Sequence, residues 1–376
     1  MSAGETNIEP ERLAGRLEAL PGIDRVREAA AGLSAYLVGG AVRDLLIGRE
    51  RADIDVAVEG DAAELAHRLG GDVRAHERFA TATVRVDGLV VDLAATRAET
   101  YERPGALPEV RPAPLADDLA RRDFTVNAMA VPLAGDPELI DPHGGLRDLD
   151  RGELRILHAG SFTDDPTRAL RAARYAARYR FSLERETSER LSDVDLATVS
   201  RDRVEAELRK LADEPEAGRG FELLAEWGLL EVEPEATALV DAVSAVLSAE
   251  PWRSVASRDE AVLAAALGRG TERARQLADL VPARPSEAVE LARDRTAVEL
   301  ALARALGAEW LDRYVSVWRD VRLEINGDDL LAEGIAEGPA VGRGLAAALR
   351  AKLDGEISGR DQELRAALRA ARENPD

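Results

Sequence analysis

The sequence contains no cysteine, which excludes disulfides, thiolate metal sites and a cysteine nucleophile. Aromatic residues make up only 4% of its 376 residues, and lysine occurs only as Lys210 and Lys352, so arginine carries nearly all of the positive charge. No apolar run approaches the roughly 20 residues that a membrane span needs. The acidic start, MSAGETNIEPERLAGR, lacks the apolar core of a signal peptide. We therefore expect a cytoplasmic protein without membrane contact.

The formal net charge of −21 argues against indiscriminate binding to nucleic acid, because phosphate contacts dominate that affinity. A nucleic-acid enzyme of this charge has to concentrate its arginines locally. Residues 161–181 do so, with five arginines against two aspartates, a net charge of +3. A solvated surface helix in such an acidic chain is expected to be acidic, so this segment is a candidate binding surface.

The stretch from Tyr36 to Glu59 is predicted to fold as a strand, a glycine turn, a helix and a second strand. The apolar Tyr36–Val38 ends on Gly39-Gly40, a pair typical of positive φ or close backbone approach. Residues 41–47 have helical spacing, and Gly48 is a C-terminal stop signal.

Two aspartates, Asp53 and Asp55, alternate with apolar residues on the second of these strands and so share one of its faces. Two carboxylates about 7 Å apart along a strand can hold divalent metal ions against the phosphates of a substrate. The helix that follows Gly39-Gly40 offers those phosphates free N–H groups and a positive dipole. Each feature alone has a structural explanation, as a tight turn or a solvated edge, but their order favours a phosphate and metal site.

The motif Gly39-Gly40-x-x-Arg43-Asp44, followed by Asp53-x-Asp55, resembles the head of the bacterial tRNA nucleotidyltransferase/poly(A) polymerase family, in the polymerase-β superfamily. The resemblance implies template-independent addition of CMP and/or AMP from CTP and ATP to the 3′ acceptor end of tRNA, with release of pyrophosphate. It also implies two Mg²⁺ ions held by Asp53 and Asp55, and binding of the nucleotide by Gly39, Gly40 and Arg43.

A third carboxylate, Asp92, lies in a predicted hairpin. Two strand-like runs, residues 81–86 and 89–94, flank Asp87-Gly88, which is a strong signal for a two-residue turn. If the topology is that of the family, the strand of Asp92 lies next to the strand of Asp53. Asp92 is then the natural third catalytic residue, although a single aspartate in a strand is more often structural.

Residues 101–114 contain four prolines and one glycine, and we expect an extended, mobile loop rather than an element. The following segment is predicted to be helical, with Leu115, Leu119 and Val126 as its apolar stripe. Its RRDFTVNAM resembles the second motif of the family, which implies that Arg122 contacts the nucleotide and Asp123 the ribose hydroxyls. A surface ion-pair cluster is the alternative.

A further predicted helix begins near Pro166, with Asp165 as its N-cap. The segment resembles the Glu-Asp-x-x-Arg motif of the family, in which an aspartate and an arginine pair with the Watson–Crick edge of the incoming base. This implies that Asp165 and Arg168 select the base; Asp164 replaces the usual glutamate. Arg171 and Arg174, on the next turns, would bind triphosphate or sugar.

The predicted fold class is α+β, with a nucleotidyltransferase head of a small mixed sheet and helices, followed by helices alone. A leading helix over residues 8–31, with Leu13, Leu17 and Leu20 as its stripe, precedes the head. Residues 201–210 resemble the last core motif of the family, and residues 325–357 loosely resemble the tail segment of many of its members. The predicted parts are an N-terminal helix (1–32), the head (33–158), a neck (159–215), a body (216–300) and a tail (301–376).

Several functions remain open at this level. CCA-adding, CC-only, A-only and poly(A)-adding enzymes share the head motifs, and the segment TRAETYERPGALPEV looks somewhat like that of single-specificity members. A small-molecule nucleotidyltransferase shares the glycine and aspartate motifs, but it has no reason to carry the pair Asp165 and Arg168. A catalytically inactive RNA-binding protein is disfavoured by the presence of both Asp53 and Asp55.

Overall fold

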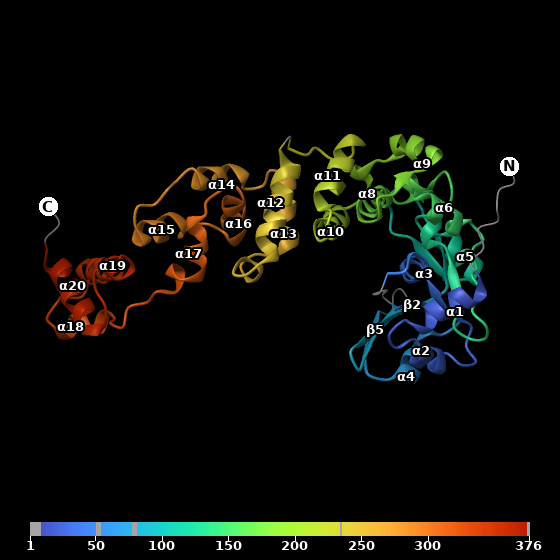
Figure 1. Cartoon of the computed structure of the whole chain (residues 1–376), viewed down its shortest axis with the longest axis horizontal. Helices are drawn as coiled ribbons and strands as arrows, with labels where there is room; N and C mark the ends of the chain where they lie inside the picture. Colours follow the sequence, from blue (N-terminus) through green and yellow to red (C-terminus); the bar gives the residue numbers. More distant parts are fainter. Residues whose placement is uncertain (1–8, 50–53, 77–80, 234, 374–376) are drawn as a thin grey trace. The chain divides into compact units, whose positions relative to one another are not determined.

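The computed structural model describes residues 9–49, 54–76, 81–233 and 235–373. The chain forms two compact units, residues 1–207 and 208–376. The first unit holds the sheet, and the described part of the second contains helices and no strand (Figure 1). The predicted α+β class, a mixed sheet followed by helices alone, is confirmed, while the finer division into five parts stays a prediction.

A six-stranded mixed sheet, in the order β3-β4-β5-β2-β1-β8, forms the centre of the first unit. The inner strands β2 and β5 are parallel, whereas the other neighbours are antiparallel. Asp55 and Asp92 are paired across β2 and β5, and paired residues on neighbouring strands point to the same face. The strands are β1 (Ala35–Val38), β2 (Ile54–Val58), β3 (Asp72–His76), β4 (Thr81–Val86), β5 (Leu89–Ala95) and β8 (Ala130–Pro132).

The local signals around this sheet fold as predicted. Helix α3 (Gly40–Ile47) follows Gly39, whose φ is 65°, and ends at Gly48, whose φ is 75°. The hairpin between β4 and β5 turns at Asp87-Gly88, with φ values of 49° and 82°. Asp61 caps helix α4 (Ala62–Leu69) by accepting a hydrogen bond of 2.8 Å from the backbone N–H of Ala63.

The prediction of one leading helix is wrong. Two helices, α1 (Pro10–Glu18) and α2 (Ile23–Ala29), are separated at Pro21-Gly22, where Gly22 has a φ of 79°. Proline lacks the N–H that a helix interior needs, and a left-handed glycine ends a helix, so this pair outweighs the periodicity of the leucines. The leucines of the predicted stripe are nevertheless buried.

The prediction that residues 101–114 contain no regular element is also wrong. Strand β7 (Glu109–Pro112) pairs antiparallel with β6 (Arg97–Thr100) as a separate two-stranded sheet. Proline is tolerated in edge strands, where its missing N–H costs no ladder bond. The intervening loop is anchored at Gly105, whose N–H donates to the carbonyls of Thr163 and Asp164.

Helix α5 (Leu115–Ala120) is shorter than predicted, and the Arg-Arg-Asp motif lies beyond its end rather than on it. Phe124 is extended, with a φ of −134°, and a 3-10 turn at Thr125–Asn127 leads into β8. Asp123 accepts a 2.8 Å hydrogen bond from the N–H of Phe124, and such a bond to the backbone competes with helix formation. The motif is therefore held by side-chain contacts.

The elements that connect the sheet to the second unit include a long helix, α8, which begins at Thr167 with Pro166 just before it. Strand β9 precedes this helix in the chain and β10 follows it, and the two strands pair in parallel as a short sheet. The elements are α6 (Gly145–Arg151), β9 (Glu153–Leu154), α7 (Ser161–Asp164), α8 (Thr167–Tyr179), β10 (Ser182–Leu183), α9 (Arg185–Glu189) and α10 (Arg201–Ala212).

The second unit is helical as predicted. Helices α15 and α16 are separate, because Thr296 and Glu299 make a capping box that starts α16. No described helix is long and apolar enough to cross a membrane. The helices are α11 (Ala217–Glu226), α12 (Ala236–Ser248), α13 (Arg258–Ala266), α14 (Thr271–Ala278), α15 (Pro285–Ala292), α16 (Ala297–Ala305), α17 (Trp310–Ser316), α18 (Gly327–Ala332), α19 (Pro339–Leu353) and α20 (Arg360–Arg372).

Candidate active site

A cleft of about 500 Å³ in the first unit is lined by β2, α3, β6, α8 and the segment after α5. Eight arginines and five carboxylates line it, so its walls are positive in a chain that is strongly acidic. The positive charge predicted at residues 161–181 does line this cleft, together with arginines from several other elements. The eight arginines are Arg43, Arg97, Arg121, Arg122, Arg168, Arg171, Arg174 and Arg178.

The two described carboxylates of the predicted metal site lie side by side. Asp55 is half-buried and lines the cleft, while Asp92 is exposed and lines an adjoining depression that Asp55 shares. The hydroxyl of Thr83, on β4, donates a 2.6 Å hydrogen bond to Asp92 Oδ1. Asp53 lies outside the described residues, and among the described ones no cluster of three metal-ligating side chains occurs.

The glycine turn brings the backbone against an arginine. A Cβ atom on Gly39 would lie 2.5 Å from one terminal nitrogen of Arg122, and the φ of 65° at Gly39 is one that other residues rarely adopt. Arg122 itself donates to Asp118 Oδ2 at 2.8 Å and to the carbonyl of Asn127 at 3.3 Å. The predicted close approach at Gly39 is confirmed, and Gly39, Gly40 and Arg122 all line the cleft.

Arg43 lies in the wall of the cleft with its donors engaged by the protein. It is 5% exposed and donates to Asp44 at 2.9 Å, to Asn127 at 2.5 Å and to the hydroxyl of Tyr179 at 2.5 Å. Its guanidinium also lies 4.4 Å from the centre of the Tyr179 ring. These contacts join α3, the turn before β8 and the end of α8; direct binding of a nucleotide by Arg43 stays a prediction.

Asp123 is buried, and its two carboxylate oxygens meet different partners. Its Oδ1 accepts from the N–H of Phe124 and, at 2.9 Å, from the side chain of Asn127, while Oδ2 forms a 2.7 Å ion pair with Arg171. Burial by itself would raise the pKa of Asp123, but Arg171, Asn127 and Arg168 outweigh it and hold that pKa below its ordinary value. The motif after α5 and helix α8 are thereby joined at one point of the cleft.

The proposed base-selecting pair lies at the start of α8. Asp165 Oδ1 accepts from the backbone N–H of Thr167 at 3.1 Å and from its hydroxyl at 2.6 Å, which confirms the capping interaction expected for this aspartate. Arg168 is 4% exposed and donates to the Ser161 hydroxyl at 2.7 Å and to the carbonyl of Arg121 at 2.8 Å. One and two turns on, Arg171 and Arg174 line the same cleft.

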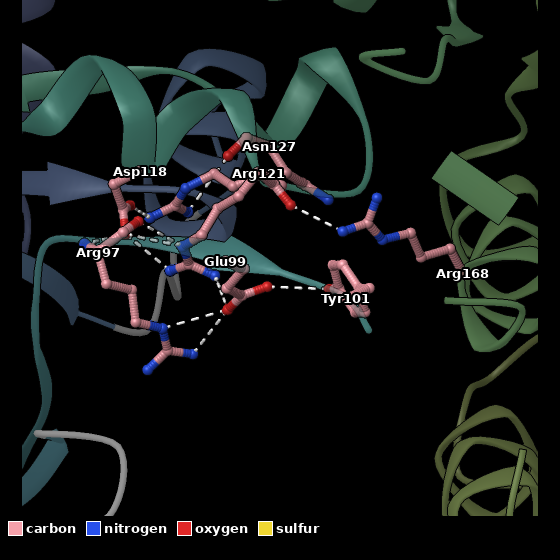
Figure 2. A network of polar contacts seen from close by, with 8 residues as sticks. Arg97, Glu99, Tyr101, Asp118, Arg121, Asn127 and Arg168 are labelled. Atoms are coloured by element: carbon pink, nitrogen blue, oxygen red, sulfur yellow. Dashed lines mark hydrogen bonds and ion pairs between the residues drawn. The ribbon is translucent and has the colours of Figure 1, made fainter. Parts of the chain in front are cut away.

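A network on β6 was missed by the sequence interpretation. Glu99 accepts from Arg121 at 2.7 Å, from Arg97 at 3.2 Å and from the hydroxyl of Tyr101 at 3.0 Å (Figure 2). Burial is the main cause that raises the pKa of Tyr101 to about 12; the charge of Arg168 opposes it, and the neighbouring Glu99 adds to it. The alternation of Arg97, Glu99 and Tyr101 was the available signal, because alternate residues of a strand share one face.

The comparisons with known proteins agree with this arrangement. Residues 35–155 match the Poly A polymerase head domain. The chain is 43% identical over 217 residues to the A-adding tRNA nucleotidyltransferase of Halalkalibacterium halodurans, covering 54% of this chain and 51% of that one. It is 42% identical over 212 residues to the CC-adding tRNA nucleotidyltransferase of Deinococcus radiodurans, covering 54% and 57%. The matched part is thus about half the length of these curated relatives.

Solved structures extend the likeness over nearly the whole chain. A CCA-adding enzyme in its apo form II has a TM-score of 0.76 and 28% identity, with 96% of each chain covered. The Thermotoga maritima CCA-adding enzyme, complexed with tRNA, has a TM-score of 0.70 and 27% identity, covering 96% of this chain and 97% of that one. With the head domain, the cleft and these likenesses together, the chain carries a Poly A polymerase head domain at residues 35–155 and is similar as a whole to bacterial tRNA nucleotidyltransferases.

Proposed function

We propose that the protein adds nucleotides to the 3′ acceptor end of tRNA without a nucleic-acid template, using CTP, ATP or both and releasing pyrophosphate. The observation that carries the proposal is a single cleft that combines a carboxylate-bearing strand, a glycine turn at a helix N-terminus and the pair Asp165 and Arg168. A small-molecule nucleotidyltransferase needs the first two features but not the third. The reaction places the protein with tRNA and free nucleotides, in the cytoplasm.

Two Mg²⁺ ions are the proposed cofactors, held by Asp53 and Asp55 together with Asp92. The donor set fits them, because Asp55 and Asp92 are in register on neighbouring strands and carboxylate oxygens are preferred ligands of Mg²⁺. When bound, the ions would lower the pKa of the attacking 3′-hydroxyl and stabilise the leaving oxygen.

The side chains of the cleft would bind and orient the nucleotide. The N–H groups at the start of α3, next to Gly39 and Gly40, would donate hydrogen bonds to phosphate oxygens, and Arg122 lies against this turn. Asp123, held by Arg171, would bind the ribose hydroxyls. Arg174 would contribute positive charge near the triphosphate, and Arg43 would keep α3 and α8 in place through its buried contacts.

Base selection would depend on Asp165 and Arg168. A carboxylate accepts from the exocyclic amine that cytosine and adenine carry, whereas uracil presents a carbonyl there and would leave two acceptors facing each other. The guanidinium of Arg168 would donate to the ring nitrogen or carbonyl beside that group. The pair therefore favours CTP and ATP over UTP.

The test uses purified protein, Mg²⁺ and tRNA transcripts that lack A, CA or CCA, each with one nucleotide at a time. We expect incorporation of CMP, AMP or both by the wild type, and incorporation lowered roughly 10³-fold or more in Asp55→Ala. The pattern separates CCA-adding, CC-only, A-only and poly(A) activity. If no transcript is extended with any of the nucleotides, the proposal is contradicted.

A further inference from the structure

The carboxylate of Asp165 is held on one side only. Its Oδ1 accepts three hydrogen bonds, two from Thr167 and one of 2.9 Å from a terminal nitrogen of Arg203 on α10. No further partner of Asp165 occurs in the described part of the chain, and the residue lines the cleft. Oδ2 is therefore the oxygen available to a bound nucleotide.

Arg203 is itself anchored at a second point. Its other terminal nitrogen donates at 2.8 Å to the carbonyl of Gly105, in the loop between β6 and β7. This anchor is tightly enclosed, since a Cβ on Gly105 would lie 2.5 Å from the Thr198 hydroxyl. Because a guanidinium is a rigid planar fork, fixing both of its ends also fixes the direction in which it meets Asp165.

We propose that Arg203 is a positioning residue for base selection: by holding Oδ1 of Asp165, it fixes the plane of the carboxylate and directs Oδ2 toward the amine of the incoming base. This inference rests on the proposed function. The terminal torsion of aspartate is broad, so without Arg203 the carboxylate would turn over a wider range about its contacts with Thr167. A base amine would then meet a poorly aligned acceptor.

The first experiment compares Arg203→Met and Arg203→Lys with Arg201→Met as the matched control. Arg201 lies on the same helix and is exposed, and its side chain has no partner within the part of the chain that the structure describes. The measurement is kcat/KM for CTP, ATP, UTP and GTP on truncated tRNA, together with the melting temperature of each variant. Good bidentate base contacts discriminate roughly 10- to 100-fold, so we expect Arg203→Met to lose roughly 10-fold in selectivity against UTP, mainly through KM.

Arg203→Lys should retain part of the selectivity, because an ammonium keeps the charge but cannot reach both anchors in the fixed geometry of a fork. Arg201→Met should match the wild type. A uniform fall in all four rates with an unchanged ratio would show that Arg203 only supports the fold, and would overturn the inference. A wild-type protein that extends no tRNA would instead contradict the proposed function.

The second experiment uses Asp165→Asn, in which the two ends of the side chain differ. Three donors surround the position of Oδ1, so the amide oxygen should occupy it and the NH₂ group should face the base. We expect the preference for CTP over UTP to fall roughly 10-fold or more. Adding Arg203→Met should partly reverse this shift, since the amide is then less firmly oriented. Equal ratios in the single and double variants would overturn the inference.

Discussion

Both units of the protein bury charged side chains, but they use them differently. In the first unit Arg43, Asp118, Asp123 and Arg168 are each 1–5% exposed, and their contacts converge on one cleft. In the second unit Glu299 is 6% exposed and closes a capping box within one helix.

Glu363, fully buried in the second unit, accepts 2.6 Å from Lys352 and 2.7 Å from the N–H of Glu324. Glu299 and Glu363 thus serve structural contacts within their own unit, and the described pockets of that unit gather no comparable set of charges. Buried charge alone therefore does not mark a functional site. Convergence of many costly buried charges on one cavity does, because packing alone would be satisfied by apolar residues.

The largest effect is expected from removing a carboxylate of the proposed metal site. Asp55→Ala, and likewise Asp53→Ala, should lower nucleotide incorporation roughly 10³-fold or more, because the ions supply several kcal/mol of transition-state stabilisation. Circular dichroism and tRNA binding should be unchanged. The matched control is Glu363→Gln in the second unit, which should lower the melting temperature yet retain the chemistry. Normal incorporation by Asp55→Ala would remove the distinction between the units.

The next effect should come from breaking the buried pair of Asp123 and Arg171. Asp123→Ala leaves the guanidinium of Arg171 and the amide of Asn127 without their acceptor, which typically costs about 1–3 kcal/mol of stability. The KM for nucleotides should rise as well, since the ribose loses its proposed acceptor. Denaturant unfolding and steady-state kinetics check both. Asp123→Asn should keep more stability than Asp123→Ala; a change in stability with no change in KM would make the pair structural, like Glu363.

A smaller effect is expected from the network on β6. Glu99→Gln removes the negative charge that holds the partly exposed Arg97 and Arg121 in place. We expect this loss to weaken nucleotide binding by about 1 kcal/mol, which is a roughly 5-fold rise in KM. Tyr101→Phe removes only the hydroxyl contact and should change KM less. Kinetics with CTP and ATP test this order. If both variants match the wild type, the network lies outside the part of the cleft that binds nucleotide.

The smallest effect is expected on the stability of the fold at low pH. Burial opposes ionisation of Asp118 and Asp123, but their arginine partners hold both pKa values below the ordinary value. An aspartate whose pKa is lowered by folding stabilises the protein above its unfolded pKa of about 3.9 and loses this contribution as the pH falls through the folded pKa. The melting temperature should therefore decrease as the pH is lowered below about 4. Asp123→Asn should start lower and lose less over that range; an identical acid profile would contradict the assignment.

Local chemistry was readable from the sequence. Gly39, Gly48 and Asp87-Gly88 adopt the conformations expected from their residue types, and Asp165 accepts the capping bond predicted for it. These features depend on a few consecutive residues, for which backbone preference and hydrogen-bonding capacity are decisive. The arginine-rich face of α8 was predictable for the same reason, since helical spacing places its residues on one side.

Contacts between distant segments were decided only by the tertiary structure. The register sets Asp55 beside Asp92, Arg121 donates to Glu99, and Arg203 forms an ion pair with Asp165; each of these contacts joins residues 22 to 38 positions apart. The Arg-Arg-Asp motif is not helical because Asp123 accepts a hydrogen bond from the backbone N–H of Phe124 and forms an ion pair with Arg171 of α8. Periodicity specifies which face a side chain takes, but only the packed fold determines what lies opposite that face.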